Sequence, residues 1–281
     1  MQMRTSLRSI ALGAVLALSA CSPGSGSDED GPRLILVGDS TASDYTAVAA
    51  PQAGWGQALR YFLARPAQFE NAAVSGRSLR TFIDEGRWEA VLIDLKPRDV
   101  VLISMGHNDQ RDDTPARYAD PKTDFPDLLR RYVQDVRDRE ATPVIISPAP
   151  RRLWEGKAMV ETHGLYLEAY RIVSEQMDVP FINLSELGLA YLETIGADET
   201  KKDFLWLTPQ DRNRQHPSGI EDNTHFSRLG ACGMAFVLGR AFQDVDELSG
   251  LVDREKVEGP GPARPRPAPV TECAAYLDAN T

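Results

Sequence analysis

Short apolar runs and amphipathic stretches alternate along this chain. The apolar runs are typical of strands buried on both faces of a sheet, and they span residues 34–37, 68–74, 99–104, 143–148 and 179–184. The other stretches repeat apolar residues at helical spacing, and they span residues 54–63, 79–95, 124–140, 165–177, 186–196 and 228–242. This alternation predicts an α/β domain in which a mainly parallel sheet of about five strands lies between two layers of helices.

Two segments of the chain show no regular spacing of apolar residues. Residues 197–221 are polar, which predicts a long loop that either shapes a site or is disordered. Residues 251–281 are rich in proline, and we expect an extended tail that packs on the surface of the domain. The folded domain itself is therefore predicted to span residues 33–250.

Residues 1–20 have the features of a targeting segment. A basic start with Arg4 and Arg8 precedes an apolar stretch that is too short to cross a bilayer. The stretch ends in Leu18-Ser19-Ala20-Cys21, which resembles a bacterial lipobox and implies cleavage before Cys21 and lipidation of its thiol. The alternative is an ordinary secretory signal peptide. Both interpretations predict an exported protein, and lipidation would anchor it to a bacterial membrane on the periplasmic or cell-surface side, with residues 21–32 as a flexible tether.

Composition argues against two kinds of function, nucleic-acid binding and zinc binding. The formal net charge of −10 and the pI near 5.0 argue against a nucleic-acid partner. The spacing of the cysteines does not suggest a zinc site. We expect Cys232 and Cys273 to form a disulfide in an oxidising compartment. The alternative is that Cys232 is a small buried residue on a helix. We expect a monomer.

Ser40 is the first candidate for chemistry. The apolar run 34–37 ends at Gly38, where the missing Cβ allows a tight exit turn. Ser40 then lies at a strand end, the place where open α/β sheets bind ligands. The alternative is that Ser40 or Asp39 only caps the following helix.

An esterase that acts through serine also needs a base, an acid that orients the base, and donors for the oxyanion. His225 is the best base among the four histidines, and Asp222 precedes it by three residues. Gly76 and Asn108 follow other strands, and with the Ser40 amide they would form an oxyanion hole. Taken singly, each could be a turn residue, a cap or a solvated carboxylate. Their occurrence together at strand ends favours the catalytic interpretation.

The remaining polar residues near these turns are interpreted structurally. Asp39 is expected to brace the turn that carries Ser40, and His107 to support the neighbouring turn. His163 precedes a helix and His216 lies in the polar loop, so both are expected at the surface.

These residues also carry a family resemblance. Five short segments of the sequence carry it: Gly38-Asp39-Ser40-Thr41-Ala42, Gly54-Trp55-Gly56, Ala73-Val74-Ser75-Gly76-Arg77-Ser78, Gly106-His107-Asn108-Asp109 and Asp222-Asn223-Thr224-His225-Phe226-Ser227. These segments resemble the conserved blocks of the SGNH (GDSL-type) hydrolase superfamily. Within that superfamily they most resemble the rhamnogalacturonan acetylesterase branch. The resemblance implies a flavodoxin-like three-layer α/β/α fold. It also implies a Ser40, His225 and Asp222 triad, oxyanion donors from Ser40, Gly76 and Asn108, and removal of acetyl groups from pectic or related polysaccharides without a metal or cofactor.

Substrate binding is the least constrained part of this interpretation. The acidic protein would repel a galacturonate-rich chain at long range, so arginines near strand ends would have to offset that charge; the candidates are Arg77, Arg80, Arg111, Arg151, Arg152, Arg212 and Arg214. Arg77 and Arg151 are the first choices for binding carboxylates. Trp55 could stack on a sugar ring, although packing is the more common role of tryptophan.

Three functions are compatible with the sequence. The first is a lipid-anchored serine acetylesterase that acts on an acetylated carbohydrate. The second is an esterase or thioesterase for acyl chains or envelope glycans, and the third is a polysaccharide-binding lipoprotein without turnover. A cleft open to a polymer near residues 197–221 would favour the first over the second. The complete set of catalytic residue types argues against the third.

Overall fold

The computed structural model describes residues 31–258 and 266–280. The signal peptide predicted for residues 1–20, the lipidation predicted at Cys21 and nearly all of the tether 21–32 lie outside this part of the chain. No helix within the described part is long and apolar enough to cross a membrane.

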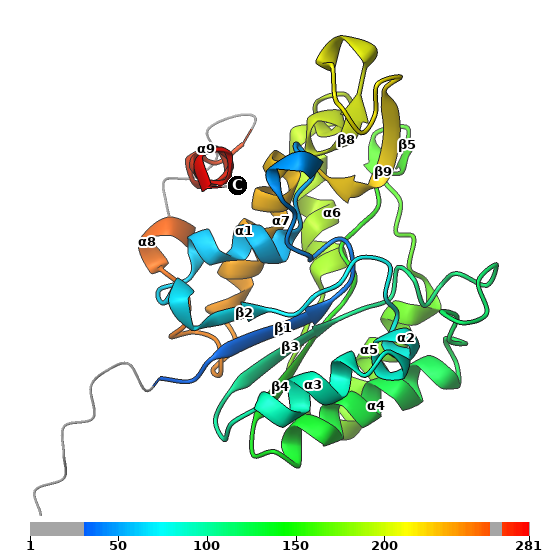
Figure 1. The fold of residues 1–281 in the computed structure, drawn as a ribbon, viewed down its shortest axis with the longest axis vertical. Helices are drawn as coiled ribbons and strands as arrows, with labels where there is room; N and C mark the ends of the chain where they lie inside the picture. Colours follow the sequence, from blue (N-terminus) through cyan, green and yellow to red (C-terminus); the bar gives the residue numbers. More distant parts are fainter. Residues whose placement is uncertain (1–30, 259–265, 281) are drawn as a thin grey trace, which may run out of the picture. The chain divides into compact units, whose positions relative to one another are not determined.

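A five-stranded sheet with the order β2-β1-β3-β4-β7 forms the centre of the fold (Figure 1). Its strands are β2 (Phe69–Asn71), β1 (Leu34–Gly38), β3 (Val100–Ser104), β4 (Thr142–Ile146) and β7 (Phe181–Ile182). All neighbours pair in parallel, which confirms the predicted α/β fold with a flavodoxin-like strand order. The order reverses at β1, so the edge between the carboxyl ends of β1 and β3 is the expected ligand site.

The residues of β1 alternate between two cores. Leu34 and Leu36 belong to a cluster on one face of the sheet, whereas Ile35 and Val37 belong to a cluster on the other, because successive side chains of a strand point to opposite faces. The first cluster includes residues of α1 (Trp55–Phe62), α6 (Leu184–Ile195) and α7 (Arg228–Phe242). The second includes residues of α2 (Leu79–Asp84), α3 (Arg87–Asp94), α4 (Asp124–Arg137) and α5 (Leu165–Met177). Helices therefore cover both faces, as Figure 1 shows.

The stretch 79–95, predicted as one helix, is two. α2 ends at Asp84 and α3 begins at Arg87, and Gly86 between them has a φ of +71°. Glycine adopts this left-handed conformation without the steric cost that a Cβ adds. The apolar spacing continues across the break, so the period alone does not reveal it.

The prediction that residues 197–221 form a loop without regular structure is also wrong. The segment contains β8 (Phe204–Leu207), which pairs in antiparallel fashion with β9 (Ile220–Phe226). Phe204 packs against Phe226 with the ring centroids 5.0 Å apart. The apolar run of β8 is short and lies among polar residues, which hides it in the sequence. The remaining short elements are η2 (Ala47–Ala49), η3 (Pro66–Gln68), β5 (Trp154–Glu155), β6 (Ala158–Met159), η4 (Glu199–Asp203) and η5 (Pro209–Asp211).

The C-terminal segment is helical where it was predicted to be extended. After α8 (Arg254–Val257), α9 (Ala268–Asn280) packs against α7 and α1. A disulfide joins Cys232 of α7 to Cys273 of α9, with their Cα atoms 5.9 Å apart. Arg266 donates from Nε to the buried Asp203 at 3.1 Å. The tail is therefore attached to the domain by a covalent bond, an ion pair and apolar packing.

We predict that replacing both cysteines, as in Cys232→Ala/Cys273→Ala, lowers the free energy of unfolding by about 4 kcal/mol, because the bridge spans 41 residues and restricts the unfolded chain. Urea unfolding measures the change. Wild type with a reductant should unfold at a similarly lowered urea concentration. An unchanged midpoint in the double variant would contradict the prediction.

Candidate active site

The turn that follows β1 is held by the buried carboxylate of Asp39. Oδ1 of Asp39 accepts hydrogen bonds from the amide and the hydroxyl of Thr41, both at 2.9 Å. The Ser43 hydroxyl donates to the Asp39 carbonyl at 2.8 Å. These bonds form a local turn of the kind that aspartate favours. Ser40 lies inside this turn with 7% of its surface exposed, so its position is fixed on both sides.

Helix α1 closes the turn from one side. The Trp55 amide donates to the Thr41 carbonyl at 2.8 Å. Gly54 is needed for this approach, because a Cβ there would lie 2.2 Å from the Ser43 carbonyl oxygen. The Trp55 side chain itself is fully buried, with 0% exposed. The prediction that Trp55 stacks on a sugar ring is therefore wrong: its indole packs in the core beneath the turn.

Strand β9 brings His225 to Ser40. Nδ1 of His225 lies 2.7 Å from Asp222 Oδ2, and Nε2 lies 2.9 Å from Ser40 Oγ. A carboxylate can only accept, so Nδ1 carries a proton and donates it to Asp222. In the neutral ring, Nε2 then accepts the hydrogen bond from the Ser40 hydroxyl. The three side chains form one relay although 185 positions separate Ser40 from His225.

The charges of this relay stabilise each other. Burial disfavours the ionised carboxylate of Asp222, but the hydrogen bonds from the His225 side chain and amide outweigh burial and lower its pKa. Burial also disfavours the imidazolium of His225, yet the hydrogen bond and the charge of Asp222 raise the pKa of the ring above its ordinary value. Asp222 is therefore a carboxylate at neutral pH, and it makes His225 a stronger base.

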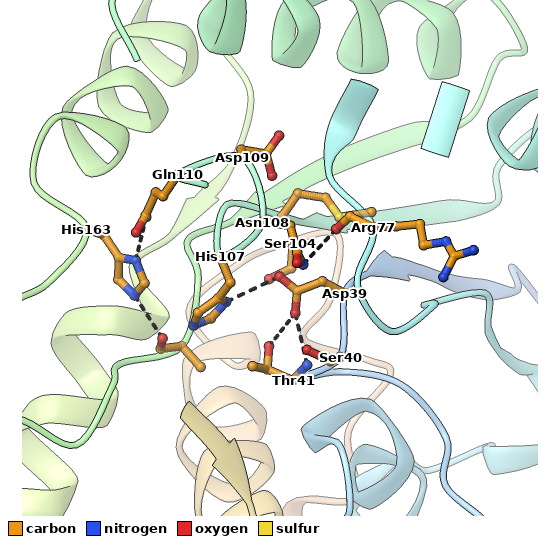
Figure 2. A network of polar contacts seen from close by, with 12 residues as sticks. Asp39, Ser40, Thr41, Arg77, Ser104, His107, Asn108, Asp109, Gln110 and His163 are labelled. Carbon is orange, nitrogen blue, oxygen red and sulfur yellow. Dashed lines mark hydrogen bonds and ion pairs between the residues drawn. The ribbon is translucent and has the colours of Figure 1, made fainter. Parts of the chain in front are cut away.

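Two further turns place hydrogen-bond donors beside Ser40. Gly76 has a φ of +79°, and Asn108 donates from Nδ2 to the Arg77 carbonyl at 3.0 Å, so the two turns are fastened together (Figure 2). Within the described chain, the amides of Ser40 and Gly76 donate no hydrogen bond. They remain available to an oxygen atom that arrives with a ligand, together with the second hydrogen of the Asn108 amide.

Asp109 supports the same turns as a neutral acid. Its Oδ1 accepts a hydrogen bond from the Leu79 amide at 2.9 Å. Complete burial, together with the nearby charge of Asp39, raises the pKa of the Asp109 carboxyl to about 8. Because this value lies above 7, Asp109 keeps its proton at neutral pH. It therefore fastens the start of α2 without adding a second buried negative charge next to Asp39.

A polar network extends from Asp39 into the protein (Figure 2). Nδ1 of His107 lies 3.2 Å from Asp39 Oδ2, and the rings of His107 and His163 meet edge to face at 4.9 Å. His163 was predicted at the surface, but it is 2% exposed and bonds to the Ala149 carbonyl and to Gln110. Burial, followed by the charges of His107 and Arg151, lowers the pKa of His163 to about 2, so its ring is neutral.

The guanidinium groups of Arg77 and Arg151 are occupied by protein partners. Nε of Arg77 lies 3.0 Å from Glu85 Oε2, and Figure 2 shows this side chain directed away from Ser40. Nη1 of Arg151 donates to Gln110 Oε1 at 3.0 Å. The bonds of Arg77 come from Nε and Nη1, whereas those of Arg151 come from Nη1 alone. Binding of a substrate carboxylate by either residue stays a prediction.

Sequence reasoning missed one residue that contacts Ser40 and another that contacts Asn108. The hydroxyl of Tyr45 donates to the Ser40 carbonyl at 2.8 Å, and Nη1 of Arg117 lies 3.4 Å from Asn108 Oδ1. The guanidinium of Arg117 also lies over Gly76, 3.5 Å from the position that a Cβ would occupy. No motif spacing identifies these residues, because both reach the site by the folding of loops.

Two carboxylates of the site are each paired with a histidine. Asp39 is joined to His107 and Asp222 to His225. In residues 31–258 and 266–280, no group of three or more His, Cys, Asp or Glu side chains is arranged to hold a metal ion. The arrangement as a whole offers a hydroxyl, a base and converging amide donors, which is the equipment for acyl transfer.

Comparison with known proteins agrees with this geometry. Residues 36–231 match the GDSL-like Lipase/Acylhydrolase family. The chain belongs to this family. The match contains the five residues predicted for the triad and the oxyanion hole, namely Ser40, Gly76, Asn108, Asp222 and His225. The prediction of a carboxylic ester hydrolase agrees with membership of the GDSL-like family.

Among curated relatives, a rhamnogalacturonan acetylesterase of Bacillus subtilis is 33% identical over 214 residues, covering 76% of this chain and 90% of the relative. A rhamnogalacturonan acetylesterase of Emericella nidulans is 23% identical over 205 residues, covering 66% and 79%. Two solved structures share the fold. The YxiM protein of Bacillus subtilis has a TM-score of 0.62 at 22% identity, covering 77% of this chain and 58% of that one. An acetylxylan esterase of Geobacillus stearothermophilus has a TM-score of 0.50 at 20% identity, covering 78% and 94%.

We predict that the imidazole of His225 titrates above its ordinary value of 6.5 in the wild type, and that Asp222→Asn lowers this pKa. The variant removes the charge and the hydrogen bond that stabilise the imidazolium, so the ring loses its proton at lower pH. NMR titration of the ring measures the shift. Asp211→Asn is the matched control, because Asp211 bonds to Thr208 of the same hairpin. Equal titration of His225 in all three proteins would contradict the prediction.

Proposed function

We propose that this chain is a serine esterase that removes acetyl groups from carbohydrate through an acyl-enzyme intermediate. The observation that carries the proposal is the relay from Ser40 Oγ to His225 Nε2 at 2.9 Å and from His225 Nδ1 to Asp222 Oδ2 at 2.7 Å. A hydroxyl becomes nucleophilic when an adjacent base takes its proton as it attacks. A pure binding protein would have no use for this relay.

In the proposed reaction, Ser40 Oγ attacks the acetyl carbonyl while His225 takes the serine proton. The amides of Ser40 and Gly76 and the side chain of Asn108 stabilise the tetrahedral oxyanion, and a single lost donor of this kind typically costs ~10²–10³ in rate. Collapse of the intermediate passes the proton from His225 to the sugar oxygen and leaves an acetyl-enzyme. Water, deprotonated by His225, then attacks the acetyl group and releases acetate and Ser40.

The proposed substrate is an acetylated polysaccharide of the rhamnogalacturonan type. Support comes from the relative that is 33% identical, a rhamnogalacturonan acetylesterase whose length the match nearly covers. Membership of the GDSL-like family, whose description also includes lipases, keeps acyl-chain esters as the competing substrate class. The comparison of substrates proposed below separates the two.

We also propose that the protein is exported and lipid-anchored through Cys21. The lipobox-like Leu18-Ser19-Ala20-Cys21 supports the anchor. The disulfide between Cys232 and Cys273 supports export, because disulfides persist in oxidising compartments and are rare in the cytosol. An anchored esterase would act on sugar chains that reach the cell envelope.

For the esterase, we predict that Ser40→Ala lowers kcat for acetate release by about 10⁴-fold or more, because the variant lacks the nucleophile. Only the residual rate that binding and the oxyanion hole provide would remain. Acetate release is measured with 4-nitrophenyl acetate and with acetylated rhamnogalacturonan and xylan oligosaccharides. Ser249→Ala is the matched control. Its hydroxyl bonds to the Asp246 carbonyl after α7 and takes no part in the turn that carries Ser40, so this variant should retain most of the activity. Wild type without activity on any of these esters would refute the esterase. A preference for long acyl esters over the oligosaccharides would refute the substrate.

For the anchor, we predict that the protein expressed in a bacterial host partitions with membranes and gains the mass of a diacylglyceryl group at Cys21. Cys21→Ser should appear in the soluble exported fraction, because the thiol that accepts the lipid is gone. Fractionation and mass spectrometry of the mature N-terminus provide the measurement. An unmodified cysteine, or cleavage at another position, would favour an ordinary secretory signal peptide.

A further inference from the structure

A cavity of about 610 Å³ lies beside the elements that carry the triad. One wall comes from the loop after Ser40 and includes Ala47, Val48 and Pro51, and the other comes from the β8–β9 hairpin and includes Arg212 and Arg214. The two walls are joined because Asn213 donates from Nδ2 to the Ala50 carbonyl at 2.7 Å. The cavity is therefore built by two distant segments of the chain and fixed by a hydrogen bond between them.

Both walls are short extensions of the catalytic elements. On one side, the Tyr45 hydroxyl bonds to the Ser40 carbonyl at 2.8 Å, and the wall begins two residues later at Ala47. On the other side, the hairpin continues into β9, which carries Asp222 and His225. A ligand in the cavity is thus held by the same segments that position Ser40 and His225.

More arginines than carboxylates line the cavity. Arg212 and Arg214 form no ion pair with any residue in 31–258 or 266–280, in contrast to Arg77, which is paired with Glu85. The third arginine of the lining, Arg228, is paired with Asp278. The carboxylate of Asp211 also lines the cavity, and it accepts from the amide and hydroxyl of Thr208 at 2.6 and 2.8 Å. The lining therefore contains two arginines without an ion pair in residues 31–258 and 266–280 and one carboxylate, that of Asp211, in a chain whose net charge is −10.

The backbone of Arg212 is held in an unusual conformation at the cavity. Its φ is +51°, a left-handed conformation that costs energy for a residue with a Cβ. The Arg212 amide donates to the Pro209 carbonyl at 3.2 Å, which holds the residue in this conformation at the cavity. Val48, 72% exposed, provides an apolar contact on the opposite wall. Together the walls offer donors for an anion and a surface for the C–H face of a sugar ring.

We infer that Arg212 and Arg214 form a subsite that binds the carboxylate of a uronic acid residue in the sugar chain, outside the position of the acetyl ester. Guanidinium groups match carboxylates in planar, bidentate geometry. The subsite gives an acidic enzyme a local means of holding an acidic polymer. This inference rests on the proposed function for its role in catalysis, but the binding of an acidic oligosaccharide does not depend on turnover.

Binding and turnover test the subsite separately. The variant is Arg212→Gln/Arg214→Gln, and the matched control is Arg98→Gln. Arg98 likewise forms no ion pair within the described residues and has a positive φ, +74°, but it precedes β3 at the opposite end of the sheet. Isothermal titration with unacetylated galacturonate oligosaccharides should show a Kd at least about tenfold weaker in the double variant and unchanged in the control. Wild type that does not bind these oligosaccharides, or equal binding by all three proteins, would overturn the inference.

The turnover measurement compares acetylated galacturonate oligosaccharides with the same compounds whose carboxylates are methyl-esterified. The ratio of kcat/KM for the acidic over the neutral substrate should fall at least about tenfold in the double variant, mainly through KM, and should stay at the wild-type value in Arg98→Gln. An equal fall on both substrates would show a general structural role and overturn the inference. Failure of the esterase itself would appear instead as wild type that releases no acetate while it still binds the acidic oligosaccharide.

Discussion

The parallel pairing of β1 with β3 is the constraint on which the site depends. Their register runs from Leu34 beside Val100 to Gly38 beside Ser104, so the two strands end at the same edge of the sheet. The turn that carries Ser40 and the turn that carries Asn108 must therefore lie next to each other. Asp39 of the first turn and His107 of the second form a hydrogen bond that joins the two turns. A different register would separate the serine from the amide donors and would expose the buried carboxylate.

The β8–β9 hairpin supplies the base of the site, and the C-terminal segment helps to hold the hairpin in place. His225, the imidazole that bonds to Ser40, comes from β9, which pairs with β8 and does not belong to the central sheet. The Ser227 amide bonds to the Asp203 carbonyl at 3.0 Å, and Asp203 is in turn paired with Arg266 from the segment that leads into α9. The position of the base is thus connected to the C-terminal segment through a buried ion pair, and the disulfide keeps that segment in place.

The surroundings of each buried ionisable group in this region determine whether that group is charged or neutral. Asp39 stays ionised because His107 and Thr41 bond to its carboxylate and outweigh the cost of burial. Asp109 accepts from a backbone amide and has no cationic partner among the described residues, so burial keeps it protonated. His163 is neutral for the same physical reason, since burial disfavours its charged form. The protein therefore concentrates negative charge at Asp39 and Asp222, each next to a histidine.

The local sequence pattern predicted the central sheet and five of the covering helices. Together with the family resemblance it also identified Ser40, Asp222 and His225, which the structure brings together. Fully apolar runs can be buried only between two layers, and polar residues at their carboxyl ends must then share one edge. Tertiary structure decided the rest. Trp55 and His163 are buried because other segments fold over them, and the β8–β9 hairpin and α9 exist because Phe204 and Cys273 find distant partners in Phe226 and Cys232. Contacts between residues far apart in the chain leave no periodic trace in the sequence, so only the fold reveals them.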